Sequence, residues 1–243
     1  MQTIVATFFL FALLECCFKG YVWPKEPRWA VRGIAYLALV IAMGEWVAPA
    51  MHRLIHPYAL WDLSSLGLWA LLPTLFVYEV LVYLFHRALH DIPFLWRIHQ
   101  THHSTERLDI WSAYHAHPLE TIIFMFVGAL VSHVLLGVTA ETSFWLTMIL
   151  VPIQTFEHTN IRTPKWLGYV IARPENHMLH HARGVHRANY ADIPIIDMIF
   201  GTFVLPEKAP DSVGFWDGAS QQFIRKWSLK DISEPQEQRM SAL

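Results

Sequence analysis

Residues 64–90 read SSLGLWALLPTLFVYEVLVYLFHRALH, an apolar run that ends in two histidines four positions apart. Residues 63–78 carry no charge, and the run extended to residue 85 is about long enough to cross the hydrocarbon of a bilayer. His86 and His90 therefore lie where this helix is expected to leave the membrane. The stretch predicts a membrane-spanning helix that presents imidazole rings at a membrane surface.

Other parts of the chain share the apolar character of this segment. We expect further helices at 3–18, 33–50, 119–138 and 142–157, the last of which is short for a span. The pattern predicts an all-α integral membrane bundle of about four to five transmembrane helices. A large soluble helical protein with a thick core is the alternative, and the charge-free runs argue against it.

The composition of the chain narrows its class further. Its 243 residues are 54% hydrophobic and 16% charged, with a formal net charge of −2. These values exclude a disordered chain and a basic nucleic-acid-binding protein. Cys16 and Cys17 are adjacent, so they form neither a disulfide framework nor a CxxC site. The 15 histidines, against 18 lysines and arginines, are the unusual feature.

The first apolar block has no basic residue before it, whereas Lys19 and Lys25 follow it. A secretory signal peptide has the opposite order, so we interpret the block as a retained helix with an external N-terminus. Alternation then predicts cytoplasmic segments at 19–32, 86–118 and 158–243, and external segments at 51–63 and 139–141. Of the 18 lysines and arginines, only Arg53 falls in an external segment, as the positive-inside rule expects.

Most histidines belong to three boxes, HRALH at 86–90, HQTHH at 99–103 and HMLHH at 177–181. Offsets of three and four residues place the rings of each box on one helical face. All three boxes lie in predicted cytoplasmic segments, as do His115, His117 and His158. We therefore expect a histidine-rich helical cap on the cytoplasmic face of a multi-pass membrane protein.

Converging neutral imidazoles form a site for borderline transition metals such as iron or zinc. Ionisable residues at membrane depth usually mark function, since they are costly there unless paired or ligated. Two metals need more ligands than one histidine triad offers. We expect one HxxHH box to supply a triad of ligands to one metal and the other box to supply a triad to the second metal. The HxxxH pair and another histidine would complete the two sets.

Other histidines receive no ligand role. His52 and His56 repeat the HxxxH spacing, but the predicted topology places them on the opposite side of the membrane. His133 lies in the middle of a predicted span, where a packed, hydrogen-bonded residue is the simpler interpretation. His186 follows the third box, and the spacing leaves open whether it supports the site or belongs to a loop.

In combination, the ordered boxes resemble those of the fatty acid hydroxylase and sterol desaturase superfamily, the membrane-bound histidine-box di-iron oxygenases. The resemblance covers residues 70–205 and includes SAYHAHPLE at 112–120, EHTN at 157–160, Asn189-Tyr190 and DMIFGT at 197–202. The family often has glycine where this chain has Ala191. We accordingly divide the chain into N-terminal transmembrane helices at 1–65, a di-iron catalytic domain at 66–205 and a polar C-terminal cytoplasmic tail at 206–243.

The resemblance implies two non-haem irons held by histidines. Carried onto this chain, the ligands are His86, His90, His99, His102, His103, His177, His180 and His181, with His158 as a further ligand. His117 is a weaker candidate, because Pro118 favours a helix start there. No catalytic residue separate from these ligands is expected.

Ligating imidazoles need partners for their other ring nitrogen. The acids and amides near the boxes that could serve, alongside His186, are Glu79, Glu120, Glu157, Asn160 and Asp197. Each has an alternative interpretation as an ordinary helix cap, ion pair or solvated group.

The resemblance implies an enzyme that uses O₂ to hydroxylate an unactivated C–H bond of a lipid that enters from the bilayer. Such a reaction requires a redox metal, so zinc in a purified sample would be a substitute. The chain has no GxGxxG fingerprint and no cysteine cluster, so we expect electrons from a separate ferredoxin- or cytochrome-type partner. The surface of this chain on which the partner docks would be basic and would include Arg97, Arg107, Arg162, Lys165, Arg173, Arg183 and Arg187. Neutralisation of the membrane-facing rim is an equally good explanation of these basic residues.

The sequence pattern also allows other functions. A lipid desaturase or a carotenoid-ring hydroxylase would use the same boxes. A non-catalytic membrane metal-binding or transport protein is an alternative from another class, but a transporter places ionisable residues near the midplane of several helices. A zinc hydrolase is disfavoured because no HExxH motif is present. A haem-binding bundle would need histidines that project into the bundle from different spans. Only His133 is clearly placed to do so, which argues against this function.

Overall fold

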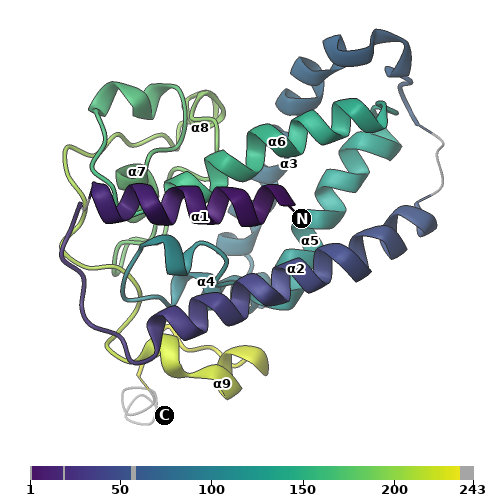
Figure 1. The fold of residues 1–243 in the computed structure, drawn as a ribbon. Coiled ribbons are helices and arrows are strands. Elements are labelled where there is room, and N and C mark those ends of the chain that lie inside the picture. Colours follow the sequence, from purple (N-terminus) through teal and green to yellow (C-terminus); the bar gives the residue numbers. More distant parts are fainter. Residues whose placement is uncertain (1, 19, 56–58, 236–243) are drawn as a thin grey trace.

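The fold was analysed in a computed structural model that describes residues 2–18, 20–55 and 59–235, without the side chain of His52. Within these ranges the chain is helical and forms no strand, apart from an isolated bridge between Ala182 and Val213. Long helices run roughly side by side, and short helices gather at one of their ends (Figure 1). The predicted all-α class is confirmed.

Helices occupy all the positions where apolar blocks predict them. The long segments are α1 (Gln2–Cys17), α2 (Trp29–Leu54), the 3₁₀ helix η1 (Ser64–Ala70) with α3 (Leu71–Asp91), α5 (Pro118–Ala129) with the π-helix η3 (Leu130–Leu135), and α6 (Ala140–Glu157). Among the described residues, three segments are long and apolar enough to cross a membrane: Trp29–Met51, Ser64–Asp91 and Pro118–Leu135. The chain is thus a membrane protein, while spans at α1 and α6 stay a prediction.

Short elements build the cap at one end of the bundle (Figure 1). They are α4 (Pro93–His103), η2 (Ile110–Ser112), η4 (Lys165–Tyr169), α7 (Pro174–His180), α8 (Ile195–Phe200), η5 (Ala219–Gln221) and α9 (Phe223–Trp227). The predicted histidine-rich helical cap is therefore present as a structural unit. Its cytoplasmic location stays a prediction.

Local sequence signals explain where several helices begin. Pro93, Pro118 and Pro174 each occupy the first turn of a helix, where the missing N–H costs no hydrogen bond. The Thr139 hydroxyl caps α6 by accepting a hydrogen bond from the backbone N–H of Thr142. These starts fix the positions along the chain at which the histidine-bearing helices enter the cap.

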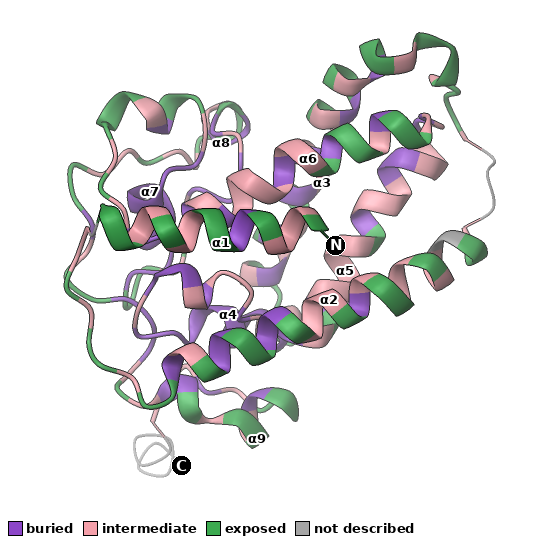
Figure 2. Ribbon diagram, viewed as in Figure 1, coloured by how far each residue is buried: buried purple, intermediate pink, exposed green. Residues whose placement is uncertain are grey.

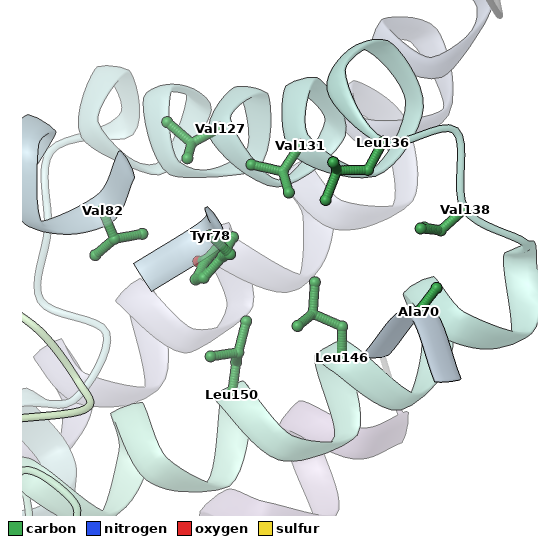
Figure 3. Close-up of a cluster of buried hydrophobic side chains, with 9 residues drawn as sticks. All are labelled: Ala70, Tyr78, Val82, Val127, Val131, Leu136, Val138, Leu146 and Leu150. Carbon is green, nitrogen blue, oxygen red and sulfur yellow. The ribbon is translucent and has the colours of Figure 1, made fainter. Parts of the chain in front are cut away.

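A buried apolar cluster joins α3, α5 with η3, and α6 (Figure 3). Tyr78 and Val82 of α3 face Val127 of α5 and Leu150 of α6 in this cluster. Between membrane helices such contacts stabilise through close packing rather than through removal of apolar surface from water. The cluster holds the middle of α3 and its end far from the cap next to the corresponding parts of α5 with η3 and of α6.

Beside its buried apolar clusters, the molecule has many exposed residues on its long helices (Figure 2). Large apolar side chains such as Leu13, Trp46 and Leu72 are exposed on the long helices. Histidines, acids and amides fill the interior of the cap, among them Gln100, Glu120 and Asn176. The long helices present a surface suited to lipid, and the polar interior lies at their end.

The C-terminal segment wraps onto the cap. Gln100 of α4 donates a hydrogen bond to the carbonyl oxygen of Lys230 and accepts one from the N–H of Ile232. The Lys226 ammonium is completely buried and donates to the Ser220 carbonyl oxygen at 2.7 Å. Over its described part, the tail therefore packs onto the cap; residues 236–243 lie outside the described residues.

Gly33 of α2 is a close contact point between the bundle and the cap. A Cβ atom at this position would lie 2.6 Å from the carbonyl oxygen of Trp111 in η2. We expect Gly33→Ala to lower the midpoint of thermal unfolding in detergent, since α2 must shift away from η2.

Gly128→Ala is the matched control, because the nearest atom to its added Cβ is 3.8 Å away. Alanine favours a helix interior over glycine by about 1 kcal/mol, so its midpoint should stay unchanged or rise. Equal midpoints for both variants would contradict the packing of α2 on η2.

Candidate metal centre

Nine histidines from four helical segments converge inside the cap and form two groups. The first group is His86, His90, His99, His103 and His180, and the second is His102, His158, His177 and His181. In each group, one nitrogen per ring lies within 4.8 Å of the corresponding nitrogen of every other member. These are the same nine residues that the sequence predicts as ligands, and their role as ligands stays a prediction.

The two HxxHH boxes are shared between the groups rather than assigned one to each. On α4, His99 and His103 point into the first group and His102 into the second. In the third box, His177 and His181 point into the second group and His180 into the first. The expectation of one triad per metal is therefore wrong in detail. An i,i+4 pair shares a helical face more closely than an i,i+3 pair, so the third ring turns toward the other group.

Ring nitrogens within each group approach to the spacing that a shared metal ion requires. The His99 Nε2 lies 3.1 Å from the His86 Nε2 and 3.0 Å from the His103 Nε2. The His181 Nε2 lies 2.9 Å from the His177 Nε2 and 3.1 Å from the His102 Nε2. Two nitrogens held about 2.1 Å from one metal at right angles would lie about 3 Å apart.

The outer ring nitrogens are held by acceptors. The Nδ1 atoms of His86, His158 and His180 donate to the carbonyl oxygens of Tyr190, Gln154 and Ala188 at 2.8, 2.6 and 2.7 Å. A carbonyl oxygen can only accept, so the proton stays on Nδ1 and the Nε2 lone pair is free. The buried Nε2 of His180 has no hydrogen-bond partner, and that of His90 has none either. This donor set fits a transition-metal cation.

A carboxylate completes this outer layer. Glu120 of α5 accepts a hydrogen bond from the His99 Nδ1 at 2.8 Å, and both side chains are buried. The sequence nominates Glu120 only as one of several acids. The structure selects it because the first turn of α5 packs against α4. A carboxylate in this position orients a ligating imidazole and raises its basicity.

The loop after the third box carries unusual backbone conformations. His186, Ala188 and Asn189 have φ angles of 42°, 70° and 52°, in the left-handed region. Such conformations cost free energy and persist where surrounding contacts impose them. The Asn189 side chain accepts from the N–H of Val204 and donates to its carbonyl oxygen. The result is a loop whose Ala188 and Tyr190 carbonyls face two rings of the first group.

Burial keeps the imidazoles neutral. Loss of hydration, reinforced by neighbouring imidazoles, holds the pKa of His102, His177 and His181 well below the usual 6.5. Burial likewise lowers the pKa of His158 to about 4. Neutral imidazole is the form that binds metals.

The remaining nominated side chains have different positions. The Glu157 Oε1 lies 3.5 Å from the His177 Nδ1 and 3.7 Å from the His158 Nδ1. Asp197 accepts hydrogen bonds from the N–H groups of Tyr190 and Ala191, and so supports the carbonyl that contacts His86. Glu157 and Asp197 thus support the site directly or through the backbone.

Two further nominated residues tie the cap together away from the rings. Glu79 accepts a hydrogen bond from the N–H of Ile193. The Asn160 side chain bonds both backbone groups of Tyr21, which fastens the segment after α1 to the cap. Neither belongs to a group of possible metal ligands among the described residues.

Three histidines outside the boxes lie in different positions relative to the two groups. The His186 Nδ1 lies 3.1 Å from the His103 Nδ1, so it supports the first group from outside. The His117 Nδ1 accepts from the N–H of Leu119 and caps α5, as expected of a residue before proline. His133 lies in η3 and outside both groups. His52 and His56 are predicted to have no ligand role, and the side chain of His52 and residue 56 lie outside the described residues.

A cavity of about 780 Å³ reaches both groups from the bundle. His86 and His99 of the first group line one end, together with His102, His158 and His177 of the second. Its walls are largely apolar and come from α2, α3, α5 and α6, with Val40, Phe124, Leu146 and Leu150 among them. The arrangement connects a site of polar chemistry to a space that suits a hydrocarbon chain.

Some features of the site leave no signal in the sequence. Trp96 lies against His90 and His103, with ring centroids 5.2 and 5.4 Å apart, yet no motif marks it. The carbonyl partners are backbone atoms that any residue carries. Conversely, Arg173 is wrong as a member of a docking surface, because it is 2% exposed and its guanidinium bonds Asn176 and the Thr163 carbonyl.

Comparison with known proteins adds an independent finding. Residues 71–202 match the Fatty acid hydroxylase family. Ornithine lipid hydroxylase OlsE of Rhizobium tropici is 29% identical over 167 residues, which cover 63% of this chain and 50% of the relative. Fatty acid hydroxylase domain-containing protein 2 of Macaca fascicularis is 29% identical over 159 residues, 65% of this chain and 43% of the relative.

A third relative matches a shorter part of the chain. Alkylglycerol monooxygenase of Homo sapiens is 31% identical over 133 residues, 50% of this chain and 27% of the relative. The chain thus spans half or less of the length of these curated relatives. No solved structure matches it.

Glu120 supplies a test of the outer layer. We expect Glu120→Gln to weaken metal binding by about 10- to 100-fold, because a neutral amide orients and polarises the His99 ring less than a carboxylate does. Metal retained during titration with a chelator measures the change.

Glu141→Gln is the control, since Glu141 is an exposed acid in the first turn of α6. Its metal retention should equal that of the unmodified protein. Retention by Glu120→Gln that matches this control would rule out the proposed role of Glu120.

Proposed function

Because the chain belongs to the fatty acid hydroxylase family, we propose that it is a membrane-bound di-iron oxygenase that hydroxylates an unactivated C–H bond of a lipid. The observation that carries the proposal is the junction of two histidine groups with a long apolar cavity. A metal-storage or transport protein has no need of such a cavity beside its ligands. The substrate class is a fatty acyl, sterol or related isoprenoid lipid.

Nine imidazoles in two adjacent groups support a pair of iron ions rather than one. The first group would hold one iron through five rings, and the second would hold the other through four. When bound, iron supplies the redox chemistry that oxidation of a C–H bond by O₂ requires, whereas zinc has none. Zinc in a purified sample would therefore mark substitution.

The protein's own groups prepare this site in three ways. Hydrogen bonds from Nδ1 to carbonyl oxygens and to Glu120 fix the ring orientations. Burial keeps the rings unprotonated, so they need not lose a proton to bind metal. The apolar cavity walls exclude water and place the chain of the substrate next to the rings of His86 and His102.

The length of the cavity supports a lipid tail as its occupant. Glu120 lies at the histidine end, and Ser132, twelve residues further along the same helical segment, also lines the cavity. At about 1.5 Å per residue, this separation is about 18 Å. A fully extended alkyl chain advances about 1.25 Å per carbon, given C–C bonds near 1.5 Å and angles near 111°, so about 14 carbons fit.

The reaction balance requires a partner. Hydroxylation of a C–H bond by O₂ consumes two electrons and two protons and yields the alcohol and water. We infer that an external ferredoxin- or cytochrome-type donor supplies these electrons. In our proposal the cap faces the cytoplasm, where such donors dock.

The central test is metal analysis of protein purified without oxygen, followed by O₂ uptake with a reductant and extracted membrane lipids. We expect two irons per chain and lipid-dependent O₂ uptake. Mass spectrometry of the products identifies the reaction, since a gain of one oxygen means hydroxylation and a loss of two hydrogens means desaturation. Tight zinc after iron-replete expression, with no oxidised lipid, would overturn the proposal.

A pair of histidine variants makes this test specific. His180→Ala should lose iron and most lipid-dependent O₂ uptake, whereas His52→Ala, near the far end of α2, should keep both. Equal losses from the two variants would contradict the assigned topology and site.

The cavity supplies a separate prediction about chain length. Gly128 lines the cavity eight residues beyond Glu120, about 12 Å at the helical rise. Gly128→Leu should shift the preferred substrate toward chains about four to five carbons shorter, because the new side chain fills the far part of the cavity. Product profiles from lipids of graded length measure the shift.

Phe126→Leu is the control, because Phe126 is exposed on α5 and does not line the cavity. Its product profile should be that of the unmodified protein. An unchanged profile for Gly128→Leu would mean that the substrate chain lies elsewhere.

A further inference from the structure

Two short cap helices, α8 and α9, have the opposite polarity to a helix on a water-facing surface. Each buries a charged side chain, Asp197 in α8 and Lys226 in α9, and exposes most of its large apolar ones. Ile196 of α8 is buried, and Arg225 of α9 is half-buried. Figure 1 shows them on opposite sides of the molecule, and Figure 2 shows exposed residues on both. A surface helix of a soluble protein has the reverse pattern.

On α8, Asp197 is fully buried and accepts hydrogen bonds from the Tyr190 and Ala191 N–H groups and the Thr202 hydroxyl. Ile195 and Ile199 lie four residues apart and are both exposed, Ile199 by 63%. An i,i+4 pair forms one continuous patch on a helix. The outward face of α8 is therefore apolar.

On α9, Lys226 is fully buried, and its ammonium contacts the Ser104 hydroxyl, the His115 Nε2 and the Ser220 carbonyl. Ile224 is 86% exposed, and Trp227 beside it is also exposed. Their offset of three residues again places them on one face. The same inversion thus occurs in two elements that are not neighbours in the sequence.

Contacts with the membrane-spanning helices place both elements at a similar depth. Phe200 of α8 stacks on Tyr83, eight residues before the cap-side end of the Ser64–Asp91 segment. Trp227 of α9 donates a hydrogen bond to the Tyr36 hydroxyl, seven residues inside the Trp29–Met51 segment. The apolar part of the first segment ends before His86, and that of the second begins after Arg32. At about 1.5 Å per residue, both contacts therefore lie about 4–6 Å inside the boundaries at which these helices are expected to leave the membrane.

We propose that α8 and α9 are membrane-contacting elements whose apolar faces bind the acyl and head-group region of the leaflet next to the cap. The occupant is lipid because each face adjoins exposed apolar residues of a membrane-spanning helix. Leu84 of α3 is exposed next to Tyr83, which Phe200 contacts, and Ile34 of α2 is exposed two residues before Tyr36, which Trp227 contacts. An aromatic residue such as Trp227 suits this interfacial depth.

A third element extends the same surface. η4 exposes Trp166 and Tyr169, and the ring of Tyr169 contacts Phe203, just after α8. Tryptophan and tyrosine are the residues that concentrate at membrane–water boundaries. We assign η4 to the head-group side of the α8 contact.

Lipid contact by the cap and the C-terminal segment is separate from the proposed reaction. It anchors the C-terminal tail at the membrane surface through α9. It also places the histidine groups near the level of the lipid head groups, so a lipid chain reaches them without leaving the bilayer.

Nitroxide labels on single cysteines test the proposal in the full chain. Cys16→Ser and Cys17→Ser provide the background, and Ile199→Cys and Ile224→Cys carry the label in phosphatidylcholine vesicles. We expect collisions with membrane-soluble O₂ and loss of collisions with a water-soluble nickel chelate at both sites. The measurement needs no bound metal and no enzymatic activity, so it fails or succeeds independently of the proposed function.

Two labelled controls define the scale. Leu72→Cys reports an exposed position inside a candidate span, and Asp211→Cys reports an exposed position on the cap. Ile199→Cys and Ile224→Cys should match Leu72→Cys in nickel protection. Nickel access equal to that of Asp211→Cys would mean contact with water and would overturn the proposal.

Protection from both reagents would mean that protein covers these faces, for instance a second copy of the chain, and would also overturn it.

Discussion

Nine imidazole rings must remain neutral and point their free nitrogens at one another, and the rest of the structure depends on this constraint. Water would occupy the ring nitrogens and leave the pKa of each ring near 6.5, whereas burial lowers that pKa and keeps the rings neutral. A buried ring in turn needs a partner for its second nitrogen, or the tautomer is undefined. Backbone carbonyls of Gln154, Ala188 and Tyr190 and the carboxylate of Glu120 meet this need for four of the nine rings.

Satisfying this need explains why the cap is polar inside. The loop that supplies two of the carbonyls adopts left-handed conformations at His186, Ala188 and Asn189, and bonds to Val204 and Asp197 hold it there. The C-terminal segment closes over α4 with a buried lysine. Polar groups occupy the interior of the cap, and apolar side chains of α8 and α9 lie on its exterior, where we propose that they contact the membrane.

The same inversion connects the reaction to its substrate. The cavity extends from the histidines into the bundle, so a lipid chain can occupy it while the reacting carbon stays beside the rings. In our proposals, α8 and α9 hold the cap at the membrane surface, which shortens the path of the lipid to the site. Family membership, the cavity and the exposed apolar faces are independent observations, and all three are consistent with a lipid substrate.

The sequence by itself determined the helical class and the positions of the long helices, because apolar periodicity is a local property. The nine residues that converge were predicted from the resemblance of the histidine boxes to those of a known family. The sequence nominated Glu120 and His186 without distinguishing them from acids and histidines that serve the fold, such as Glu79 and His117. Only the tertiary structure decided that each HxxHH box is divided between two groups, that Arg173 is buried and that α8 and α9 expose their apolar faces. These features depend on which helices meet at the cap and at what angle. Contacts between residues far apart in the chain set that geometry, and no single segment encodes it.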